Sequence, residues 1–144
     1  MIRRAVAVVV LLAICIFVLT FFKLVLTDGQ SMMPTFSPGD LVLCCRLYRQ
    51  PKAGDVIVIQ RNDTLLIKRV AAAPGEVAEA VDSTTGQRRI YAYWGSDDDA
   101  TVPEGFFFVA GDNPAKSLDS RDPEFGLVKQ GEIWGFVLTV IRSG

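Results

Sequence analysis

The chain has 144 residues, half of them hydrophobic, with 15 Lys and Arg, 16 Asp and Glu, a net charge of -1 and no histidine. This length suits one small domain with an appendage, and the absence of a basic cluster argues against nucleic acid as a partner. Without histidine, Ser-His-Asp and Cys-His catalysis, HExxH zinc sites and imidazole proton shuttles within this chain are excluded. Any hydrolytic reaction must therefore take its general base from a lysine or a carboxylate.

The first predicted element is a membrane anchor. Residues 5–22 are uncharged and apolar, and at about 1.5 Å per residue a helix of this length covers roughly 27 Å, close to a bilayer core. Arg3 and Arg4 precede it and keep the short N-terminus in the cytoplasm by the positive-inside rule. A cleaved signal peptide is the alternative, but its apolar region would be unusually long and no convincing cleavage site follows. We expect an uncleaved anchor over residues 1–23 and an extracytoplasmic domain over residues 24–144.

From residue 41 onward the sequence predicts a small all-β domain. Valine, isoleucine and aromatic residues gather in short runs, and Gly, Pro, Asn and Asp separate these runs, as in chains of β-strands and turns. The predicted strands cover residues 41–48, 56–60, 64–73, 76–81, 87–94, 106–110 and 133–141. The fourth and fifth of these are expected to form a hairpin with Gly86 near its turn.

The three cysteines predict neither a disulfide framework nor a zinc site. Cys15 lies within the anchor, and Cys44 and Cys45 are neighbours whose side chains would point to opposite faces of a strand. No CxxC motif or Cys-His spacing is present. We expect Cys44 or Cys45 to be a small core residue.

Lys68 is a candidate general base. Strand alternation places it on the same face as Leu66 and Val70, against apolar surface. Burial disfavours the ammonium form and lowers the pKa of a lysine, so a buried Lys68 could act as a base near neutral pH. The alternative is an edge lysine whose stem packs on the sheet while its ammonium group reaches water, which is the commoner outcome of this pattern.

Ser31 is the candidate nucleophile, in the stretch "DGQSMMPTFSPGD" that follows the anchor. A serine hydroxyl is a weak nucleophile until a base takes its proton, and without histidine Lys68 is the leading candidate for that base. The two residues would then form a Ser-Lys dyad. The alternative interpretation makes Ser31 a polar loop residue beside Pro34, and either residue alone would not indicate an active site.

Five ordered segments after the anchor resemble those of bacterial type I signal peptidases, which are membrane-anchored Ser-Lys proteases. "SMMPT" (31–35) resembles their nucleophile box, and "IKRVAAAPGE" (67–76) resembles their lysine box. "GDLVL" (39–43) and "PKAGDVIVI" (51–59) resemble the strand pair between these boxes, and residues 102–126 resemble the last two boxes. Five segments in order are far more specific than one short string. The resemblance implies an all-β catalytic domain of small, mixed antiparallel sheets after one N-terminal transmembrane helix.

The resemblance also implies roles for individual residues. Ser31 matches the acylating nucleophile, Lys68 matches its general base, and Ser117 matches the serine that orients the lysine. Arg69 matches the basic residue beside the catalytic lysine. The residues that match the support of the active-site loop are Gly111, Asp112, Asn113, Asp119, Ser120 and Arg121, with an ion pair between Asp119 and Arg121.

Met32 and Ile67 match positions near the substrate pockets of the family. At Gly29 some relatives have a serine that donates to the oxyanion hole, so the backbone N–H of Ser31 would be the main donor here. The interval between the lysine box and the Gly-Asp-Asn turn is also short. The large accessory β-domain of some relatives must therefore be mostly absent.

The resemblance implies an endopeptidase that removes signal peptides at the outer face of the bacterial cytoplasmic membrane. Nine extended residues separate Phe22 from Ser31 and reach at most about 30 Å, which holds the nucleophile near the bilayer. The implied partners are signal peptides of exported preproteins and the lipid bilayer, with no nucleic acid. We expect a monomer in transient contact with the secretion machinery, without metal or organic cofactor.

Three alternatives remain at this stage. A specialised peptidase for a few substrates, such as pilins, conjugation proteins or spore proteins, would have the same residues. A self-cleaving repressor of the SOS type would cut an Ala-Gly bond upstream of its serine, but Ala53-Gly54 and Ala110-Gly111 both lie downstream of Ser31. A catalytically silent, membrane-tethered β-domain would have no need of Ser31, Lys68 and Ser117 together.

Overall fold

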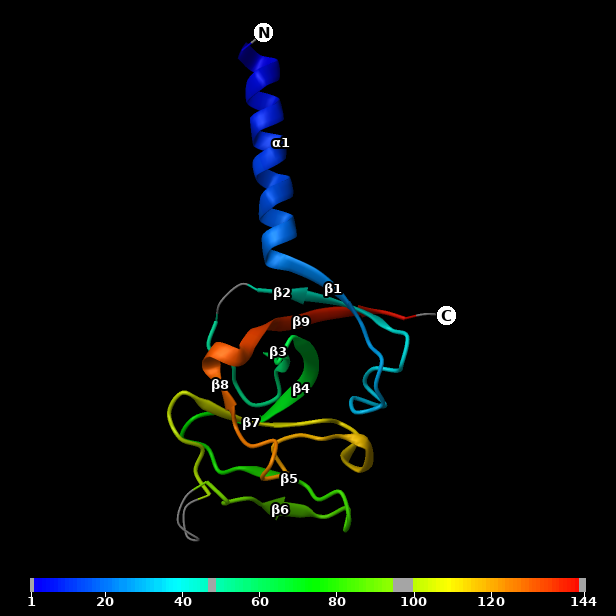
Figure 1. Cartoon of the computed structure of the whole chain (residues 1–144), viewed down its shortest axis with the longest axis vertical. Coiled ribbons are helices and arrows are strands. Elements are labelled where there is room, and N and C mark those ends of the chain that lie inside the picture. The colour runs from blue at the N-terminus through cyan, green and yellow to red at the C-terminus, as the bar shows by residue number, and fades with distance from the viewer. Residues whose placement is uncertain (1, 47–48, 95–99, 143–144) are drawn as a thin grey trace.

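The computed structural model describes residues 2–46, 49–94 and 100–142 of the chain, and it consists of one long helix and a β-domain (Figure 1). Helix α1 (Ile2–Phe21) has no buried residue and projects away from the β-domain. Within the described residues it is the one helix long and apolar enough to cross a membrane. The predicted anchor is therefore present as a helix, which ends at Phe21.

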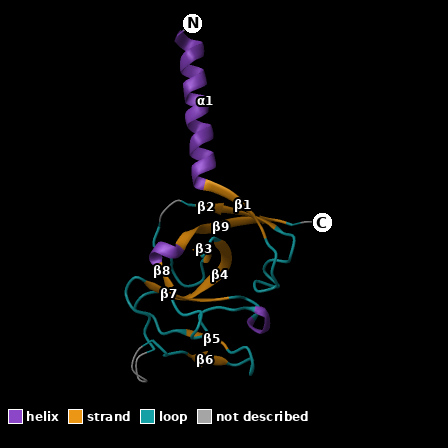
Figure 2. Cartoon of the chain, in the orientation of Figure 1, coloured by secondary structure: helices purple, strands orange, loops and turns teal. Residues whose placement is uncertain are grey.

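The main sheet of the β-domain has seven antiparallel strands in the order β1-β2-β9-β3-β4-β7-β8 (Figure 2). The strands of this sheet are β1 (Phe22–Leu26), β2 (Leu41–Cys45), β3 (Val56–Arg61), β4 (Thr64–Ala72), β7 (Phe106–Ala110), β8 (Val128–Lys129) and β9 (Ile133–Ile141). A separate hairpin pairs β5 (Glu79–Val81) with β6 (Arg88–Ile90). Two short 3-10 helices, η1 (Pro114–Lys116) and η2 (Gln130–Glu132), complete the described elements.

A strand lies within each of the seven predicted ranges, although residues 47 and 48 of the first range lie outside the described residues, and two further strands were not predicted. Strand β1 begins at Phe22, directly after the helix, and it pairs with β2. Its residues continue the apolar run of the anchor, so the sequence alone gives no boundary there. Strand β8 has only two residues, too few for a periodic pattern.

The hairpin between β3 and β4 fixes which face of the sheet Lys68 occupies. Arg61 pairs with Thr64 across Asn62 and Asp63, whose φ angles of 48° and 61° match a two-residue hairpin turn of the I′ kind. The resulting register places Lys68 opposite Ile57. A shift of one residue would turn Lys68 to the other face of the sheet, so this turn helps to determine the surroundings of its amino group.

The predicted alternation of β4 is confirmed by how its side chains pack. Leu66 and Val70 pack in one apolar cluster with Ile57, Ile59, Phe107, Val109, Val128 and Phe136. Leu65 and Ile67, on the other face, pack in a second cluster with Met32, Phe36, Val42, Cys44 and Val58. A third cluster, around Phe108 and Tyr91, lies beneath the β5-β6 hairpin.

Both Cys44 and Cys45 are buried, whereas the sequence led us to expect one of them in the core. Cys44 packs in the second cluster, and the carbonyl group of Cys45 lies against Gly135 of β9. A register shift in the pairing of β2 with β9 lies beside these two cysteines. The side chains on both faces of β2 are therefore buried at this point.

The close approach of β9 to β2 leads to the first prediction. A Cβ at Gly135 would lie closer to the Cys45 carbonyl oxygen than non-bonded atoms can approach. Gly135→Ala should therefore lower the free energy of unfolding by about 1–3 kcal/mol, because the backbones must separate. Urea unfolding of the full chain in detergent micelles measures the change. Gly131→Ala is the matched control, because a Cβ there has no heavy atom within 4 Å; equal effects of the two substitutions would contradict this packing.

Candidate active site

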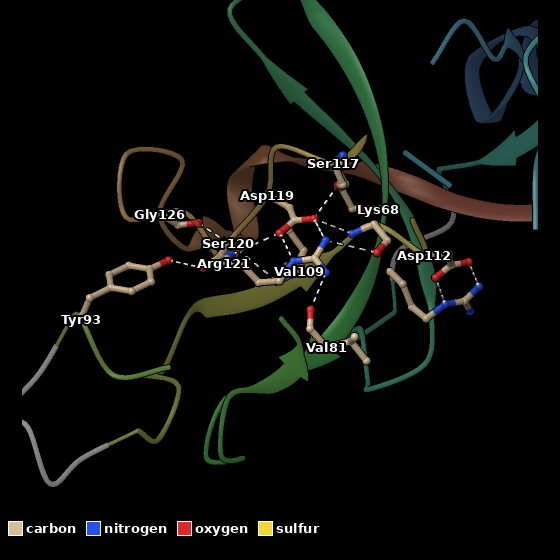
Figure 3. Close-up of polar contacts among 12 residues, drawn as sticks. Lys68, Val81, Tyr93, Val109, Asp112, Ser117, Asp119, Ser120, Arg121 and Gly126 are labelled. Atoms are coloured by element: carbon tan, nitrogen blue, oxygen red, sulfur yellow. Dashed lines mark hydrogen bonds and ion pairs between the residues drawn. The ribbon is translucent and has the colours of Figure 1, made fainter. Parts of the chain in front are cut away.

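Lys68 is buried in the middle of β4, with only 4% of its surface exposed. Its amino group donates a hydrogen bond to Ser117 Oγ at 2.9 Å (Figure 3). Burial lowers the pKa of Lys68; the negative charge of Asp119 raises it and the positive charge of Arg121 lowers it, and the net shift is downward. The predicted burial of Lys68 is thus present, and its environment favours the neutral amine.

Ser31 lies in the loop between β1 and β2 and faces the same cavity as Lys68. The cavity has a volume of about 260 Å³. Its walls come from the end of β1 and the loop after it, residues 25–29, and from the first half of β4, residues 64–68. The structure therefore brings the two predicted members of the dyad into one cavity.

The walls of this cavity are largely apolar. Met32 and Ile67, both predicted near the substrate pockets, line it, and Phe36 lies with them. Met32 and Phe36 are buried, which anchors the loop of Ser31 on the sheet. Among the described residues, Asp28 and Lys68 are the titratable groups of the lining.

Asp119 is a buried carboxylate that organises the loop behind Lys68. Ser117 Oγ donates to Asp119 Oδ2, and the backbone N–H of Gly111 donates to the same oxygen at 2.8 Å. Arg121 Nε donates to Asp119 Oδ1 at 2.8 Å, which forms the expected ion pair. Because Ser117 gives its proton to Asp119, its oxygen is left to accept a hydrogen bond from the amine of Lys68. The network thereby sets the direction of the lysine.

Gly111 is a point of close approach between the loop of Ser31 and the loop of Ser117. A Cβ at this position would collide with Ser117 Oγ and with the carbonyl oxygen of Ser31. The same carbonyl accepts a hydrogen bond from the backbone N–H of Asn113 at 2.9 Å. The absence of a side chain at Gly111 therefore lets the loops of Ser31 and Ser117 meet.

Asp112 connects the nucleophile loop to the lysine strand. Arg69, the neighbour of Lys68, donates two hydrogen bonds to its carboxylate, at 2.8 and 2.6 Å. Thr35 donates to the same carboxylate at 2.5 Å. The sequence analysis gave Thr35 no role, although it is the last residue of the "SMMPT" motif. Its position in that motif was the available signal.

Ser120 supports the same loop from the side of the core. Its hydroxyl donates to the Gly126 carbonyl at 2.8 Å and accepts the backbone N–H of Val109 at 3.1 Å. Its own carbonyl accepts the hydroxyl of Tyr93 at 2.5 Å. Every predicted loop residue therefore takes part in the hydrogen bonds around Asp119, Asp112, the Ser31 carbonyl or Ser120, and Tyr93 is a further participant that was not predicted.

The position of Gly29 leaves open space beside the nucleophile. A Cβ at Gly29 would have the backbone nitrogen of Ser31 as its nearest neighbour, at 3.9 Å. A side chain at this position could therefore reach the N–H of Ser31, but glycine supplies no donor of its own.

Comparison with known proteins gives the chain a family. The model of the family described as "Signal peptidase, peptidase S26" matches residues 1–85 and 82–141. Mitochondrial inner membrane protease subunit 1 of Schizosaccharomyces pombe is 36% identical over 120 residues, covering 78% of this chain and 68% of that protein. Signal peptidase I of Bacillus licheniformis is 28% identical over 155 residues, covering 92% of this chain and 82% of that protein. The crystal structure of a signal peptidase I from Enterococcus faecalis is 33% identical and covers 63% of this chain and 98% of that one, with a TM-score of 0.45.

The second prediction concerns Asp119. Burial raises the pKa of this carboxyl, but hydrogen bonds from Arg121, Gly111 and Ser117 outweigh burial and hold it below its usual value. Its contribution to stability is therefore present above the unfolded pKa, about 3.9, and is lost as the pH falls through the folded pKa. Asp119→Asn should cost about 3–5 kcal/mol at pH 7, since it leaves Arg121 without its partner charge.

Unfolding of the full chain in micelles at a series of pH values measures this effect. The stability gap between the unchanged protein and Asp119→Asn should narrow below about pH 4, because asparagine does not titrate. Asp63→Asn, at an exposed hairpin turn, is the control and should behave like the unchanged protein. A gap that is constant over the whole pH range would show that Asp119 does not act through its charge.

Proposed function

The chain belongs to the signal peptidase family, peptidase S26, and we propose that Ser31 and Lys68 form its catalytic dyad. As a member of this family it is a membrane-associated serine endopeptidase that removes signal peptides. The observation that carries the assignment of the dyad is the burial of Lys68 in the cavity that Ser31 lines. Lys68 is the buried titratable group of that lining, whereas Asp28 is exposed.

The reaction follows from the protonation state of Lys68. The neutral amine takes the proton of Ser31 Oγ as that oxygen attacks the scissile carbonyl carbon of the substrate. The ammonium group then gives the proton to the departing amine, which frees the mature protein and leaves the signal peptide as an ester on Ser31. Lys68, neutral again, activates a water molecule that hydrolyses this ester. Ser117 holds the amine in place during both steps through its hydrogen bond.

The negative charge on the carbonyl oxygen needs a donor in both steps. The backbone N–H of Ser31 is the donor that we assign, because the oxyanion forms next to the nucleophile. Gly29 adds no side-chain donor, although the space beside Ser31 would accommodate one. Hydrogen bonds of the active-site loop support this arrangement without contact to the reacting atoms; the residues that make them are Asp112, Asn113, Asp119, Ser120 and Arg121.

The substrate fits as an extended strand across the cavity. Residues 64–68 of β4 pair with β3 on one side, and pairing with β7 on the other side begins at Arg69. Their second edge therefore has no strand partner within the described residues, and β1 is an edge strand of the same sheet. An extended signal peptide can add to these edges, while Met32 and Ile67 line the pocket for its side chains. The limited volume favours small side chains at the scission site.

The position of the anchor keeps this cavity near the bilayer. Leu24 and Leu26 of β1 and Leu138 and Ile141 of β9 are exposed, and Figure 1 shows both strands at the end of the domain next to α1. An apolar surface there suits contact with lipid. We assign residues 1–23 to the cytoplasmic N-terminus and anchor, and residues 24–144 to the extracytoplasmic peptidase domain.

We assign the protein to the bacterial cytoplasmic membrane. The signal peptidase I of Bacillus licheniformis covers 92% of the chain, against 78% for the mitochondrial relative. Arg3 and Arg4 favour a cytoplasmic N-terminus by the positive-inside rule. Ser31, Lys68 and Ser117 come from one chain, which is consistent with a monomer that meets the secretion machinery transiently.

The third prediction tests the dyad. Ser31→Ala and Lys68→Ala should each reduce cleavage of a preprotein in proteoliposomes by at least about 1,000-fold, and the double substitution should cost little more, because the two residues act as one unit. Circular dichroism should show that all three variants keep the fold. Turnover of Lys68→Ala near that of the unchanged protein would remove the lysine from the mechanism.

The fourth prediction concerns pH. Since Lys68 must be neutral to act, kcat/KM should fall as the pH drops through its lowered pKa, and no histidine can produce this limb. Lys68→Arg should be inactive at every pH, because arginine stays protonated. Rates on an uncharged peptide from weakly acid to alkaline pH measure the limb.

Asp28→Asn is the control for this pH profile, because Asp28 is the other titratable group of the cavity. The substitution should leave the position of the acidic limb unchanged. A rate that stays flat into the acid range, or a limb that disappears with Asp28→Asn, would contradict the assignment of Lys68.

A further inference from the structure

Two positive charges converge on one indole ring at the membrane end of the β-domain. Lys23 Nζ lies 5.6 Å from the ring centre of Trp134, and the guanidinium carbon of Arg46 lies 6.0 Å from it. Both cationic side chains belong to exposed residues. Both cationic groups therefore lie beside the same ring, where an anionic group can approach either of them.

Neither charge has an acidic partner in the described part of the chain. Ion pairs at 2.5–2.7 Å bind five arginines of the β-domain to carboxylates. Those arginines are Arg49, Arg61, Arg69, Arg88 and Arg121. Lys23 instead lies near the thiol of Cys44, whose pKa burial raises to about 11 and the charge of Lys23 lowers, so this neighbour is neutral. Two like charges held together without an acid favour an anion from outside.

The backbone holds both charges at the point where the helix leaves the membrane. Lys23 is the second residue after α1, and the backbone N–H of Arg46 donates to the carbonyl of Phe21, the last helical residue, at 2.7 Å. A helix of 20 residues spans about 30 Å, so its end reaches the headgroup layer (Figure 1). A tryptophan ring favours the same layer.

The packing of Trp134 makes this arrangement rigid. Lys23 is paired with Cys44 in the β1-β2 ladder, and Gly135, the residue after Trp134, packs against the backbone of Cys45 and Arg46. Trp134 itself packs on the cluster that contains Met32 and Val58. Lys23 lies on β1, Arg46 directly follows β2 and Trp134 lies on β9, so the main sheet holds the backbones of these three residues in fixed positions relative to one another.

We propose that Lys23, Arg46 and Trp134 bind the phosphate of an anionic phospholipid headgroup, of the phosphatidylglycerol class. The ammonium and guanidinium groups donate to the phosphate oxygens, and the indole ring lies at the base of the headgroup. A zwitterionic headgroup is disfavoured because its own cation would meet two further cations. This assignment is independent of the catalytic roles of Ser31 and Lys68.

Binding at this site would control the orientation of the β-domain on the bilayer. The anchor fixes one point of the domain, but rotation about the helix axis remains free. A bound headgroup adds a second fixed point, at β1, at β9 and at the residue that follows β2. Because Trp134 and Met32 pack in the same apolar cluster, the second point is coupled to the wall of the catalytic cavity. The cavity mouth would then keep a constant height and direction relative to the membrane.

Fluorescence quenching by brominated lipids tests the proposal without any need for catalytic activity. The full chain is placed in vesicles of one fixed mixture of phosphatidylcholine and phosphatidylglycerol. In one set the phosphatidylglycerol carries bromine on its acyl chains, and in the other an equal amount of phosphatidylcholine carries it. The described chain has a second tryptophan, Trp94, which packs on Phe108 near the β5-β6 hairpin, at the end far from α1, and serves as the unquenched reference.

Brominated phosphatidylglycerol should quench Trp134 more strongly, with a local preference of roughly 30-fold for two basic side chains at a membrane surface. Lys23→Gln with Arg46→Gln should abolish the preference, and Lys23→Arg with Arg46→Lys should retain it. Arg88→Gln with Arg89→Gln, which removes two charges on β6, is the matched control and should also retain it. Equal quenching by the two lipids in the unchanged protein, or a preference that survives Lys23→Gln with Arg46→Gln, would overturn the proposal.

A final measurement separates a lipid headgroup from free phosphate. Inorganic phosphate is added in large excess over the headgroups, and sodium chloride of equal ionic strength is the comparison. The preference for phosphatidylglycerol should fall equally and modestly in both salts, because only screening acts. Complete loss in phosphate alone would identify a general anion site and overturn the assignment to lipid.

Discussion

The active site depends on the burial of one amino group. An ammonium ion in the position of Lys68 would lose its hydration without gaining a direct carboxylate partner, because Ser117 lies between it and Asp119. The neutral amine avoids most of this cost, so the fold lowers the pKa of Lys68 by the same packing that stabilises the sheet. In a chain without histidine this is how a base of suitable strength is obtained. The cost is a loss of stability that begins as the pH falls below the ordinary pKa of lysine, about 10.4, and is complete once the buried amine is itself protonated.

Placing this amine requires three segments that are far apart in sequence to meet. The loops of Ser31 and Ser117 meet at Gly111, where a side chain would separate them, and Lys68 on β4 joins them through its hydrogen bond to Ser117. Two carboxylates then hold the segments together. Asp119 binds the backbone of Gly111 and so closes the loop that carries Ser117. Asp112 joins the loop of Ser31, through Thr35, to the strand of Lys68, through Arg69. Each carboxylate faces an arginine and a hydroxyl group, so both stay charged and fully hydrogen-bonded. The catalytic geometry is thus a property of two ion pairs rather than of any one loop.

Local patterns predicted much of this structure, and contacts between distant residues account for the rest. Alternation along residues 64–70 placed Lys68 on the face of Leu66 and Val70, because a strand has a period of two regardless of its partners. Strand β1 was missed because its apolar residues continue those of the anchor, and its strand form comes from pairing with β2. The bond from Thr35 to Asp112 links residues 77 positions apart, and no periodicity reports such a contact. The resemblance supplied the loop residues as a set, but their partners required the three-dimensional arrangement.

The small β5-β6 hairpin has a structural function in the site. Arg121 donates to the carbonyl of Val81 on β5 at 2.8 Å, and Tyr93, just after β6, donates to the carbonyl of Ser120 at 2.5 Å. The hairpin and the residues just after it therefore contact the same loop that carries Ser117 and Asp119 (Figure 3). The guanidinium group of Arg121 donates hydrogen bonds both to Asp119 and to the carbonyl of Val81 on the hairpin, so the hairpin helps to hold the ion pair in place. A shorter connection between β4 and β7 that lacks these residues would remove both contacts.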